Sequence, residues 1–461
     1  MNILKNIPLN VDSYKVSMFE QYPEGTEIVH SYIESRGGEH VETLFFGLQG
    51  FIKEYLLKPV TMEDINLAEE IMQAHGEPFN RAGWEYIVNT HGGKLPVHIR
   101  AVPEGTIVPV SNVLLTIENT DKNCFWLTTH LETALLRAIW YPTTVATNSK
   151  AIKNLIKEFL EKNGDPAGLD FKLHDFGARG VSSQESAAIG GAAHLINFMG
   201  TDTIAGILWA REHYNAGVAG FSIPAAEHST ITSWGRPHEV KAYENMLNKF
   251  AKPGSILAVV SDSYDVFNAA ENLWGGELKQ KVLDSGATLV IRPDSGDPVH
   301  VNSKLVEILD NKFGSTINNK GFRVLNNVRL IQGDGVNFDT VKKILTAFHN
   351  DGYSADNIAF GMGGALLQNV NRDTQKFAMK CSAVRVGKHD WRKVLKDPIT
   401  DSGKKSKAGL LELWRKGENF TTSETTPELL NGWERGLETV YLNGELVRDM
   451  TFEEIRNNSN A

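Results

Sequence analysis

The sequence has 461 residues, 41% of them hydrophobic, and a formal net charge of −9. A chain of this length buries a sizeable core, in two domains or in one large domain with additions. The acidic balance argues against a protein that binds nucleic acid or an anionic membrane surface. The two cysteines, Cys124 and Cys381, lack the spacing of a metal site, and so few cysteines are typical of a reducing compartment.

No segment reads as a membrane anchor or a secretion signal. No apolar run reaches the ~18 residues that a membrane helix needs. Residues 1–15 lack a long apolar stretch followed by a small-residue cleavage site. We therefore expect a cytoplasmic protein without a membrane partner.

Both ends of the chain favour strands. Residues 96–120 alternate apolar and polar side chains around Pro and Gly, as short strands do. Two amphipathic helices are expected after them, over 123–139 and 146–163. Near the C-terminus, 409–417 again predicts a strand, and Asn443-Gly444 is a hairpin signal between two more. The lysine-rich 403–407 is expected to be a solvated loop.

The middle of the chain is built from strand-then-helix units. Short apolar runs finish in clusters of Gly, Asp, Arg and His, and a helical pattern follows. These clusters, roughly 20–40 residues apart, occupy 171–180, 200–203, 221–229, 256–265, 288–298, 329–335 and 357–364. Such units form a parallel sheet with right-handed crossovers. They predict an irregular (β/α) barrel or, as the alternative, an open doubly wound sheet, and both carry their chemistry at the carboxyl ends of the strands.

The clusters contain residues that suit a phosphorylated ligand. Arginine forks match phosphate oxygens, and glycines let backbone N–H groups approach an anion. Carboxylates bind hydroxyl groups or Mg²⁺, and Phe176 adds a flat apolar side chain. The charged candidates are Arg179, His228, Arg292, Arg372, Asp202, Asp262, Asp294 and Asp334, and the glycines are Gly333, Gly335, Gly361, Gly363 and Gly364. A phosphorylated ribose with a heteroaromatic base fits this set.

Each of these residues also has a purely structural explanation. An Asp after a strand often caps the next helix, His228 can simply begin a helix, and Phe176 can belong to a core. The functional interpretation depends on all of them meeting at one edge of the sheet. Walker-type loops, G-x-S-x-G, H-E-x-x-H and Cys/His metal spacings are absent from the sequence.

Several long segments, in one order along the chain, are similar to those of the nicotinamide phosphoribosyltransferase family. The similarity extends from 12–23 to 451–458, and its most specific segments are KLHDFGARGVSSQE, GTDTIAG, PAAEHSTITSWG, VVSDSYD, IRPDSG, IQGDGV and FGMGGALLQNVNRD. The resemblance implies the fold of type II phosphoribosyltransferases, an irregular (β/α) barrel with a β-rich domain formed by both chain ends. The expected division is 1–145 for the N-terminal part of that domain, 146–380 for the barrel and 381–461 for the return.

The resemblance also implies an activity, which is the joining of nicotinamide to 5-phosphoribosyl 1-pyrophosphate in NAD salvage. Mg²⁺ would accompany the pyrophosphate-bearing substrate, ATP would be a stimulating co-substrate, and a homodimer would share its active sites. The family's direct metal ligands stay unknown from the sequence. Two alternatives remain, a nicotinate phosphoribosyltransferase and a non-catalytic metabolite sensor on the same fold.

The same resemblance assigns roles to individual residues. Phe176 and Tyr14 would sandwich the nicotinamide ring, with Tyr14 supplied by the second subunit, and Asp202 would accept a hydrogen bond from the carboxamide. The phosphate and ribose set comprises Arg179, His228, Arg292, Asp294, Gly333, Asp334, Gly364, Arg372, Arg36 and Lys380. The expected catalytic residues are His228, Asp294 and Arg292 of this set, together with Asp262. ATP would phosphorylate His228. Ala178 and Ala258 depart from the Tyr and Ser that animal members carry, which implies altered packing near the ring.

Overall fold

The computed structural model describes residues 3–387, 391–400, 405–424 and 431–460. They fall into two compact units. The first, here called the β-rich unit, comprises Met1–Thr147, Trp209–Ala216 and Asn371–Ala461, and the second, the barrel unit, comprises Asn148–Leu208 and Gly217–Val370. The junction after the barrel therefore precedes the expected 380/381, because strand β14 (Phe377–Val386) pairs along its whole length with β1 (Thr26–Ser35) of the β-rich unit.

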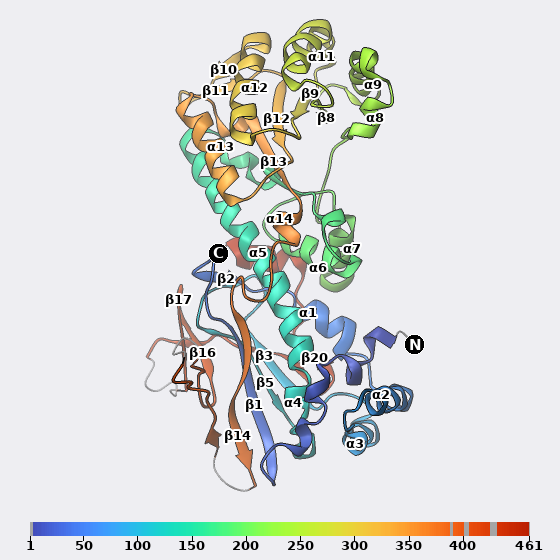
Figure 1. Cartoon of the computed structure of the whole chain (residues 1–461). Helices are drawn as coiled ribbons and strands as arrows, with labels where there is room; N and C mark the ends of the chain where they lie inside the picture. The colour runs from blue at the N-terminus through green and yellow to red at the C-terminus, as the bar shows by residue number, and fades with distance from the viewer. Residues whose placement is uncertain (1–2, 388–390, 401–404, 425–430, 461) are drawn as a thin grey trace. The chain divides into compact units, whose positions relative to one another are not determined.

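A six-stranded parallel sheet forms the centre of the barrel unit, in the order β7-β6-β13-β12-β9-β8, and Figure 1 labels four of its strands, β13, β12, β9 and β8. Its strands are β6 (Leu173–Asp175), β7 (Gly200–Thr201), β8 (Ile256–Val260), β9 (Thr288–Arg292), β12 (Val328–Gln332) and β13 (Ile358–Met362). The two edge strands bridge to the same segment, Gly200 to Phe221 and Ala258 to Ala225. The sheet thus curls into a ring that closes through single bridges. This irregular barrel uses all seven predicted clusters, and the open doubly wound alternative is wrong.

Helices follow the strands because polar residues cap them and apolar residues recur on one helix face. Asn337 accepts a hydrogen bond from Thr340 N at the start of α13, and Val341, Ile344, Leu345 and Phe348 bury the inner face of that helix. The barrel helices are α6 (Gln184–Leu195), α8 (His228–Thr232), α9 (Glu239–Phe250), α10 (Val266–Asn268), the π-helix η10 (Ala269–Glu277), α11 (Lys279–Ser285), α12 (Pro298–Phe313), α13 (Phe338–Asn350) and α14 (Gly364–Leu367). Helix α7 (Ile204–Tyr214) follows β7, and the hairpin β10 (Ser315–Ile317) and β11 (Arg323–Leu325) precedes β12.

The β-rich unit is built on a seven-stranded sheet, ordered β15-β14-β1-β5-β3-β19-β20, whose paired strands are antiparallel. Its further strands are β3 (Val97–Ala101), β5 (Val113–Asn119), β15 (Arg392–Lys393), β19 (Glu438–Leu442) and β20 (Glu445–Leu446). The predicted strands at both ends of the chain are confirmed, and β3, β5, β19 and β20 among them lie in this one sheet. Asn443 and Gly444 turn the β19–β20 hairpin with φ values of 50° and 90°, the left-handed pair that such a turn requires.

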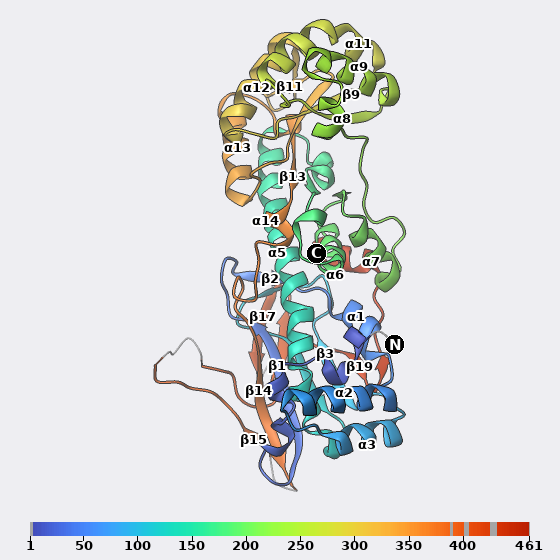
Figure 2. The ribbon, with the colours of Figure 1, turned by 45° about the vertical axis from the view of Figure 1, so that its right-hand side comes forward.

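Smaller elements complete the β-rich unit. Two small sheets contain β16 (Glu412–Lys416), β17 (Asn419–Ser423) and β18 (Glu434–Arg435), and β2 (Glu42–Leu44) and β4 (Ile107–Pro109). Helices α2 (Met62–His75) and α3 (Arg81–His91) lie side by side (Figure 2). The other helices are α1 (Leu48–Phe51), the π-helix η5 (Ile52–Leu56), α4 (Leu127–His130) and α15 (Phe452–Asn460).

Two helices were expected, over 123–139 and 146–163. The structure instead has a short helix followed by a single long helix. Helix α5 (Glu132–Asn163) follows α4 directly and continues through Pro142. A proline inside a helix removes one backbone bond and crowds the preceding turn. Here the backbone of Gly47 packs against the Pro142 ring, since a Cβ on Gly47 would lie 2.3 Å from Pro142 Cγ, and Thr143 Oγ1 donates to Phe46 O at 3.1 Å. These tertiary contacts stabilise the helix where the local sequence favours a break.

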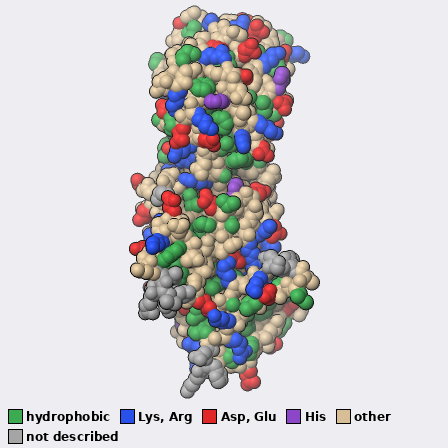
Figure 3. All heavy atoms as spheres, turned by 90° about the vertical axis from the view of Figure 1, so that its left-hand side faces the viewer, with side chains coloured by type: hydrophobic (Ala, Val, Ile, Leu, Met, Phe, Trp, Pro, Cys, Tyr) green, Lys and Arg blue, Asp and Glu red, His purple; other side chains and the backbone are tan. Residues whose placement is uncertain are grey.

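The surface agrees with the charge balance of the sequence. On the face shown in Figure 3, acidic and basic side chains are intermixed over the described residues, and hydrophobic side chains are scattered between them. In the described part of the chain, no helix combines the length and the apolar character that crossing a bilayer requires.

Candidate active site

The predicted residues of the barrel unit all follow the carboxyl ends of its strands. Because these strands are parallel, their carboxyl ends meet at one end of the ring. Phe176 and Arg179 follow β6, Asp202 follows β7, Asp262 follows β8, Arg292 and Asp294 end and follow β9, Gly333 and Asp334 follow β12, Gly364 follows β13, and His228 begins α8 after the bridging segment. The structure therefore brings together ten of the predicted residues on this unit.

The Phe176 ring occupies space that is open because Gly361 has no side chain. Its backbone N donates to Met362 O at 2.9 Å, and a Cβ on Gly361 would lie only 1.9 Å from Cε2 of the Phe176 ring. Gly361 was expected to help to cradle a phosphate, but it instead leaves room for the aromatic ring. The partly buried Phe176 ring also packs against the small apolar cluster of Ala258, Val290 and Ile331. One flat face of a ring pocket is thus fixed by the barrel itself.

Asp202 lies beside this aromatic residue along the sheet. Its backbone N donates to Asp175 O, the residue before Phe176, at 2.9 Å, and its Oδ1 accepts a hydrogen bond from Ser222 Oγ at 2.5 Å. Its side chain is exposed at the strand ends. A carboxylate held in this way can accept a further hydrogen bond from a ligand N–H group.

Hydrogen bonds and longer charge contacts connect the expected catalytic residues. His228 Nε2 lies 2.9 Å from Asp262 Oδ1, and His228 Nδ1 lies 4.0 Å from Asp294 Oδ2. The other oxygen of Asp262 accepts from Asp294 N at 3.1 Å and from Ser295 Oγ at 2.5 Å. Arg292 Nη2 lies 3.8 Å from Asp294 Oδ2. The Asp262 side chain is 5% exposed and that of His228 is 44% exposed, so a buried carboxylate orients an accessible imidazole.

Glycines allow close backbone approaches at two places near the strand ends. A Cβ on Gly333 would lie 3.1 Å from Asp294 Oδ1 and 3.6 Å from Arg292 Cδ. A Cβ on Gly180, next to Arg179, would lie 3.4 Å from the backbone N of Gly364. An arginine, a carboxylate and glycine backbone therefore meet at Gly333, a combination that suits a phosphorylated sugar.

Other residues cap the helices near Asp262, Asp294 and His228. Asp265 accepts from Phe267 N and Asn268 N and so caps α10, and Asp297 accepts from His300 N and caps α12. At the start of α8, the cap is Glu227. Asp262, Asp294 and His228 are therefore not needed as helix caps.

The remaining predicted residues lie in the β-rich unit. Tyr14 is 56% exposed in the short turn Ser13–Lys15, and Arg372 bonds Asp373 at 2.9 Å. Burial lowers the pKa of Lys380, and the nearby charges of Arg36, Lys15 and Arg372 add to the lowering. These cations therefore gather in one region of the unit.

Arg36 and Lys407 share the buried carboxylate of Glu34. Arg36 Nε lies 2.9 Å from Glu34 Oε1, and Lys407 Nζ bonds the other oxygen. Lys407 N also donates to Tyr32 Oη at 2.9 Å. The expected solvated loop at 403–407 therefore ends in a fixed lysine, while residues 403 and 404 lie outside the described residues.

Comparisons with known proteins agree with this geometry. Residues 171–434 match the model of the nicotinate phosphoribosyltransferase family, and residues 6–99 match that of the nicotinamide phosphoribosyltransferase N-terminal domain. A nicotinamide phosphoribosyltransferase of Xanthomonas campestris pv. campestris is 55% identical, over 100% of this chain and 99% of that protein. The chain belongs to the nicotinamide phosphoribosyltransferase family. A nicotinamide phosphoribosyltransferase of Acinetobacter baylyi is 33% identical, over 97% and 96% of the two chains.

Solved structures of more distant proteins share the fold. A nicotinate-nucleotide pyrophosphorylase of Pyrococcus furiosus superposes with a TM-score of 0.63 at 18% identity, covering 100% of this chain and 96% of the other. Human nicotinic acid phosphoribosyltransferase gives 0.58 at 15% identity, over 97% and 92%. Both likenesses bear out the fold of type II phosphoribosyltransferases.

Two serines of the site were missed from the sequence. Ser222 bonds Asp202, and Ser295 bonds Asp262. Both lie inside predicted clusters, but a single serine carries no motif of its own. Ala258, one of the two departures from animal members of the family, contributes to the apolar cluster against which Phe176 packs.

The acidic and histidine side chains offer little for a resident metal. Among the described residues, the only group of three or more such side chains with ligand atoms close enough together to hold one is Glu54, Glu212 and His213, in the β-rich unit. The ammonium group of Lys5 already bonds Glu54, and Lys58 lies 3.8 Å from it. These cations disfavour a metal ion there.

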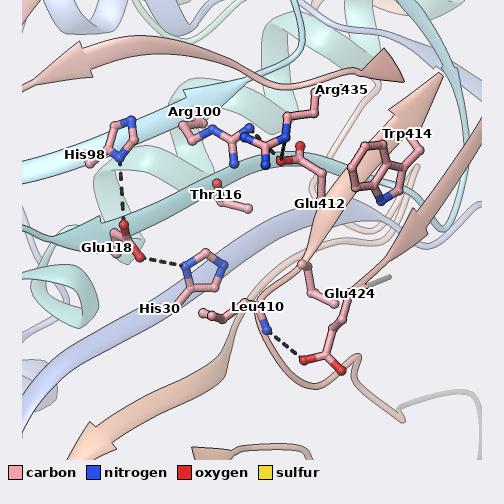
Figure 4. A pocket seen from close by; sticks show the side chains of 11 residues that line it. His30, His98, Arg100, Thr116, Glu118, Leu410, Glu412, Trp414, Glu424 and Arg435 are labelled. Atoms are coloured by element: carbon pink, nitrogen blue, oxygen red, sulfur yellow. Dashed lines mark hydrogen bonds and ion pairs between the residues drawn. The ribbon is translucent and has the colours of Figure 1, made fainter. Parts of the chain in front are cut away.

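A polar pocket of about 290 Å³ lies within the β-rich unit (Figure 4). Glu118 of β5 bonds His30 of β1 at 3.2 Å and lies 3.8 Å from His98 of β3. Hydrogen bonds from His30 and then from His98 lower the pKa of Glu118 to about 2. Arg100 bonds Glu412 across the pocket at 2.7 Å. The Glu118–His30 and Arg100–Glu412 pairs join neighbouring strands, so we assign them to the stability of the sheet, while His30 Nε2, Glu412 Oε1 and Trp414 Nε1 are buried without a hydrogen-bond partner among the described residues.

Proposed function

We propose that the protein transfers the phosphoribosyl group of 5-phosphoribosyl 1-pyrophosphate to nicotinamide in the cytoplasm, forming nicotinamide mononucleotide and pyrophosphate. The observation that carries the choice of base is Asp202, an exposed carboxylate bonded by Ser222 beside the Phe176 wall. It can accept the carboxamide N–H of nicotinamide, whereas the carboxylate of nicotinate would meet a like charge. The nicotinate alternative is therefore disfavoured.

The chemistry follows from the charges at the strand ends. Pyrophosphate leaves the anomeric carbon with its electron pair while the ring nitrogen of nicotinamide attacks, through a transition state that is positive at the sugar. Arg179 and Arg292 stabilise the departing negative charge, and Asp294 favours the sugar cation. The ring nitrogen carries no proton, so no general base is needed. The ring wall holds the nitrogen in line for attack.

Mg²⁺ fits this site as a companion of the substrate. Mg²⁺ is commonly bound by one or two carboxylates together with substrate phosphates, and Asp294 and Asp262 supply two carboxylates 2.9–4.0 Å from His228. When bound, the ion would neutralise charge on the pyrophosphate. Arg179 and Arg292 orient the same group from the protein side.

We further propose that ATP phosphorylates His228. Asp262 holds Nε2, which leaves Nδ1 as the nucleophile. Nδ1 would attack the γ-phosphorus, the bond to the bridging oxygen would break, and ADP would leave. The 44% exposure of the His228 side chain gives ATP access to it.

The second wall of the ring pocket is assigned to Tyr14 of a second subunit. Tyr14 is 56% exposed and belongs to the unit that carries Arg36, Arg372 and Lys380. A two-fold dimer would let each subunit supply these residues to the other's barrel.

One experiment tests the activity directly. The protein is incubated with 5-phosphoribosyl 1-pyrophosphate, Mg²⁺ and either nicotinamide or nicotinate, and the mononucleotide is detected by mass. We expect nicotinamide mononucleotide as the main product. A preference for nicotinate would overturn the proposed substrate, and no turnover with either base would favour a metabolite sensor.

A further inference from the structure

Asp175 is a buried acid at the ring pocket that the proposed chemistry does not use. It is the last residue of β6 and is 0% exposed. In the sheet it pairs with Thr201 of β7 on one side and with Met362 of β13 on the other. It therefore lies directly before Phe176 and beside the strand that leads to Asp202.

The side chain of Asp175 holds the turn on which the ring wall depends. Its Oδ1 accepts a hydrogen bond from Gly177 N at 2.7 Å. On the other side of Phe176, the Phe176 N–H donates to Met362 O at 2.9 Å. Hydrogen bonds thus hold the backbone at Phe176 N and at Gly177 N. The acceptor for Gly177 N is the Asp175 side chain.

The Asp175 side chain supplies the acceptor for Gly177 N, while Gly177 O accepts from Gly180 N at 2.9 Å. Gly177 is buried, so loss of the Asp175 oxygen would leave its N–H without an acceptor, which is costly inside a protein. A Cβ on Gly177 would lie 2.6 Å from Leu367 Cγ and 3.0 Å from Asp175 Oδ1. The turn is therefore packed tightly from both sides, and Phe176 is displaced if the turn moves.

The backbone and the side chain of Asp175 contact different parts of the pocket. The backbone oxygen accepts from Asp202 N at 2.9 Å, so a substitution of the side chain leaves that bond in place. The side chain reaches Phe176 through the Gly177 turn. Burial raises the pKa of this carboxyl to about 6, although the bond from Gly177 N and the neighbouring Thr203 side chain lower it in part.

We infer that Asp175 is a positioning residue for the pyridine ring, whose Oδ1 holds the Gly177 turn and so sets the Phe176 wall for any pyridine base. The inference rests on the proposed function. It separates two properties of the pocket: Asp175 governs how well a ring is held, and Asp202 governs which ring substituent is accepted.

The test compares Asp175→Ala, Asp175→Asn and a matched control, Asp297→Ala, which removes the α12 cap bond to His300 N. In Asp175→Ala we expect the KM for nicotinamide to rise about tenfold, the KM for nicotinate to rise by the same factor, and kcat to change little. Asp175→Asn keeps an oxygen for Gly177 N and should restore the KM. Asp297→Ala should leave both KM values unchanged.

A double-mutant cycle distinguishes positioning from general support. If Asp175 acts through Phe176, then Asp175→Ala should add no further rise in KM to Phe176→Ala. A full additional rise, or a fall of kcat at constant KM, would overturn the inference. If Asp175→Ala does not fold, the test uses Asp175→Asn alone. A KM of Asp175→Asn for nicotinamide as high as that of Phe176→Ala would then overturn the inference.

The same experiment separates this inference from the proposed function. If the wild type turns over but the variants deviate from the expected pattern, only the role of Asp175 is refuted and the proposed function stands. An inactive wild type refutes the proposed function. In that case the dissociation constants of nicotinamide from the same variants, measured by titration calorimetry, test the ring wall, and absence of nicotinamide binding overturns both proposals.

Discussion

The choice between nicotinamide and nicotinate should change when Asp202 loses its charge. Asp202→Asn keeps the shape of the side chain and an oxygen for the Ser222 hydroxyl, which now bonds Oδ1 at 2.5 Å. The variant loses a charge-assisted acceptor for the carboxamide and a repulsive charge for a carboxylate. A hydrogen bond to a charged group contributes ~1.5–3 kcal/mol. Because Asp202 is exposed, we take the lower half of that range, which corresponds to a roughly tenfold or larger fall in the preference for nicotinamide.

The measurement is a competition between the two bases at equal concentration, with both mononucleotides quantified by mass. The ratio of products gives the ratio of kcat/KM and is insensitive to the amount of active enzyme. Ser222→Ala is the matched control, since it removes a neighbour of Asp202 and leaves the charge. We expect a much smaller change from it. An unchanged ratio in Asp202→Asn would show that the base is selected elsewhere.

Four further outcomes are expected. His228→Ala should abolish ATP stimulation, and equal stimulation of variant and wild type in a rate assay would contradict the phosphorylation. Phe176→Ala and Tyr14→Ala, refolded together, should recover roughly a quarter of wild-type activity, because mixed dimers keep one intact site; recovery of none would place both walls in one chain. Gly361→Ala should cost about 1–3 kcal/mol in denaturant unfolding, since its Cβ would meet the Phe176 ring at 1.9 Å. Glu118→Gln should lower the free energy of unfolding by about 1 kcal/mol at neutral pH. The difference between variant and wild type should vanish as the pH falls from about 4.5 towards 2, because only the ionised form of a group with a lowered pKa stabilises the fold. A difference in unfolding free energy that persists at pH 2 would refute this.

The barrel was predictable because its signals are local. Six of the apolar runs are strands whose carboxyl ends carry a cluster of Gly and charged residues, and the seventh, at 221–225, joins the ring by isolated bridges. The same clusters did not reveal which acid caps a helix. Asp262 and Asp265 stand three residues apart, as do Asp294 and Asp297, and only the structure shows that the second of each pair caps a helix.

Other features depend on contacts that sequence patterns do not contain. Gly361 has the appearance of a phosphate-binding glycine, but its neighbour is the ring of Phe176, from a distant part of the chain. Helix α5 continues through Pro142 because the backbone of Gly47 packs on that proline. Ser222 and Ser295 complete the site through single hydrogen bonds, and nothing in the surrounding residues marks them.

The closure of the barrel has a consequence for how base preference can evolve. The segment 221–225 joins the ring only through the bridges Gly200–Phe221 and Ala225–Ala258, so its backbone tolerates change more readily than the laddered strands on either side. Ser222 lies on this segment, whereas Arg292 and Asp294 are anchored by β9 in the middle of a ladder. Under the proposed function, mutations in this segment can therefore modulate base preference more finely than loss of the Asp202 charge does, while Arg292 and Asp294 keep their positions.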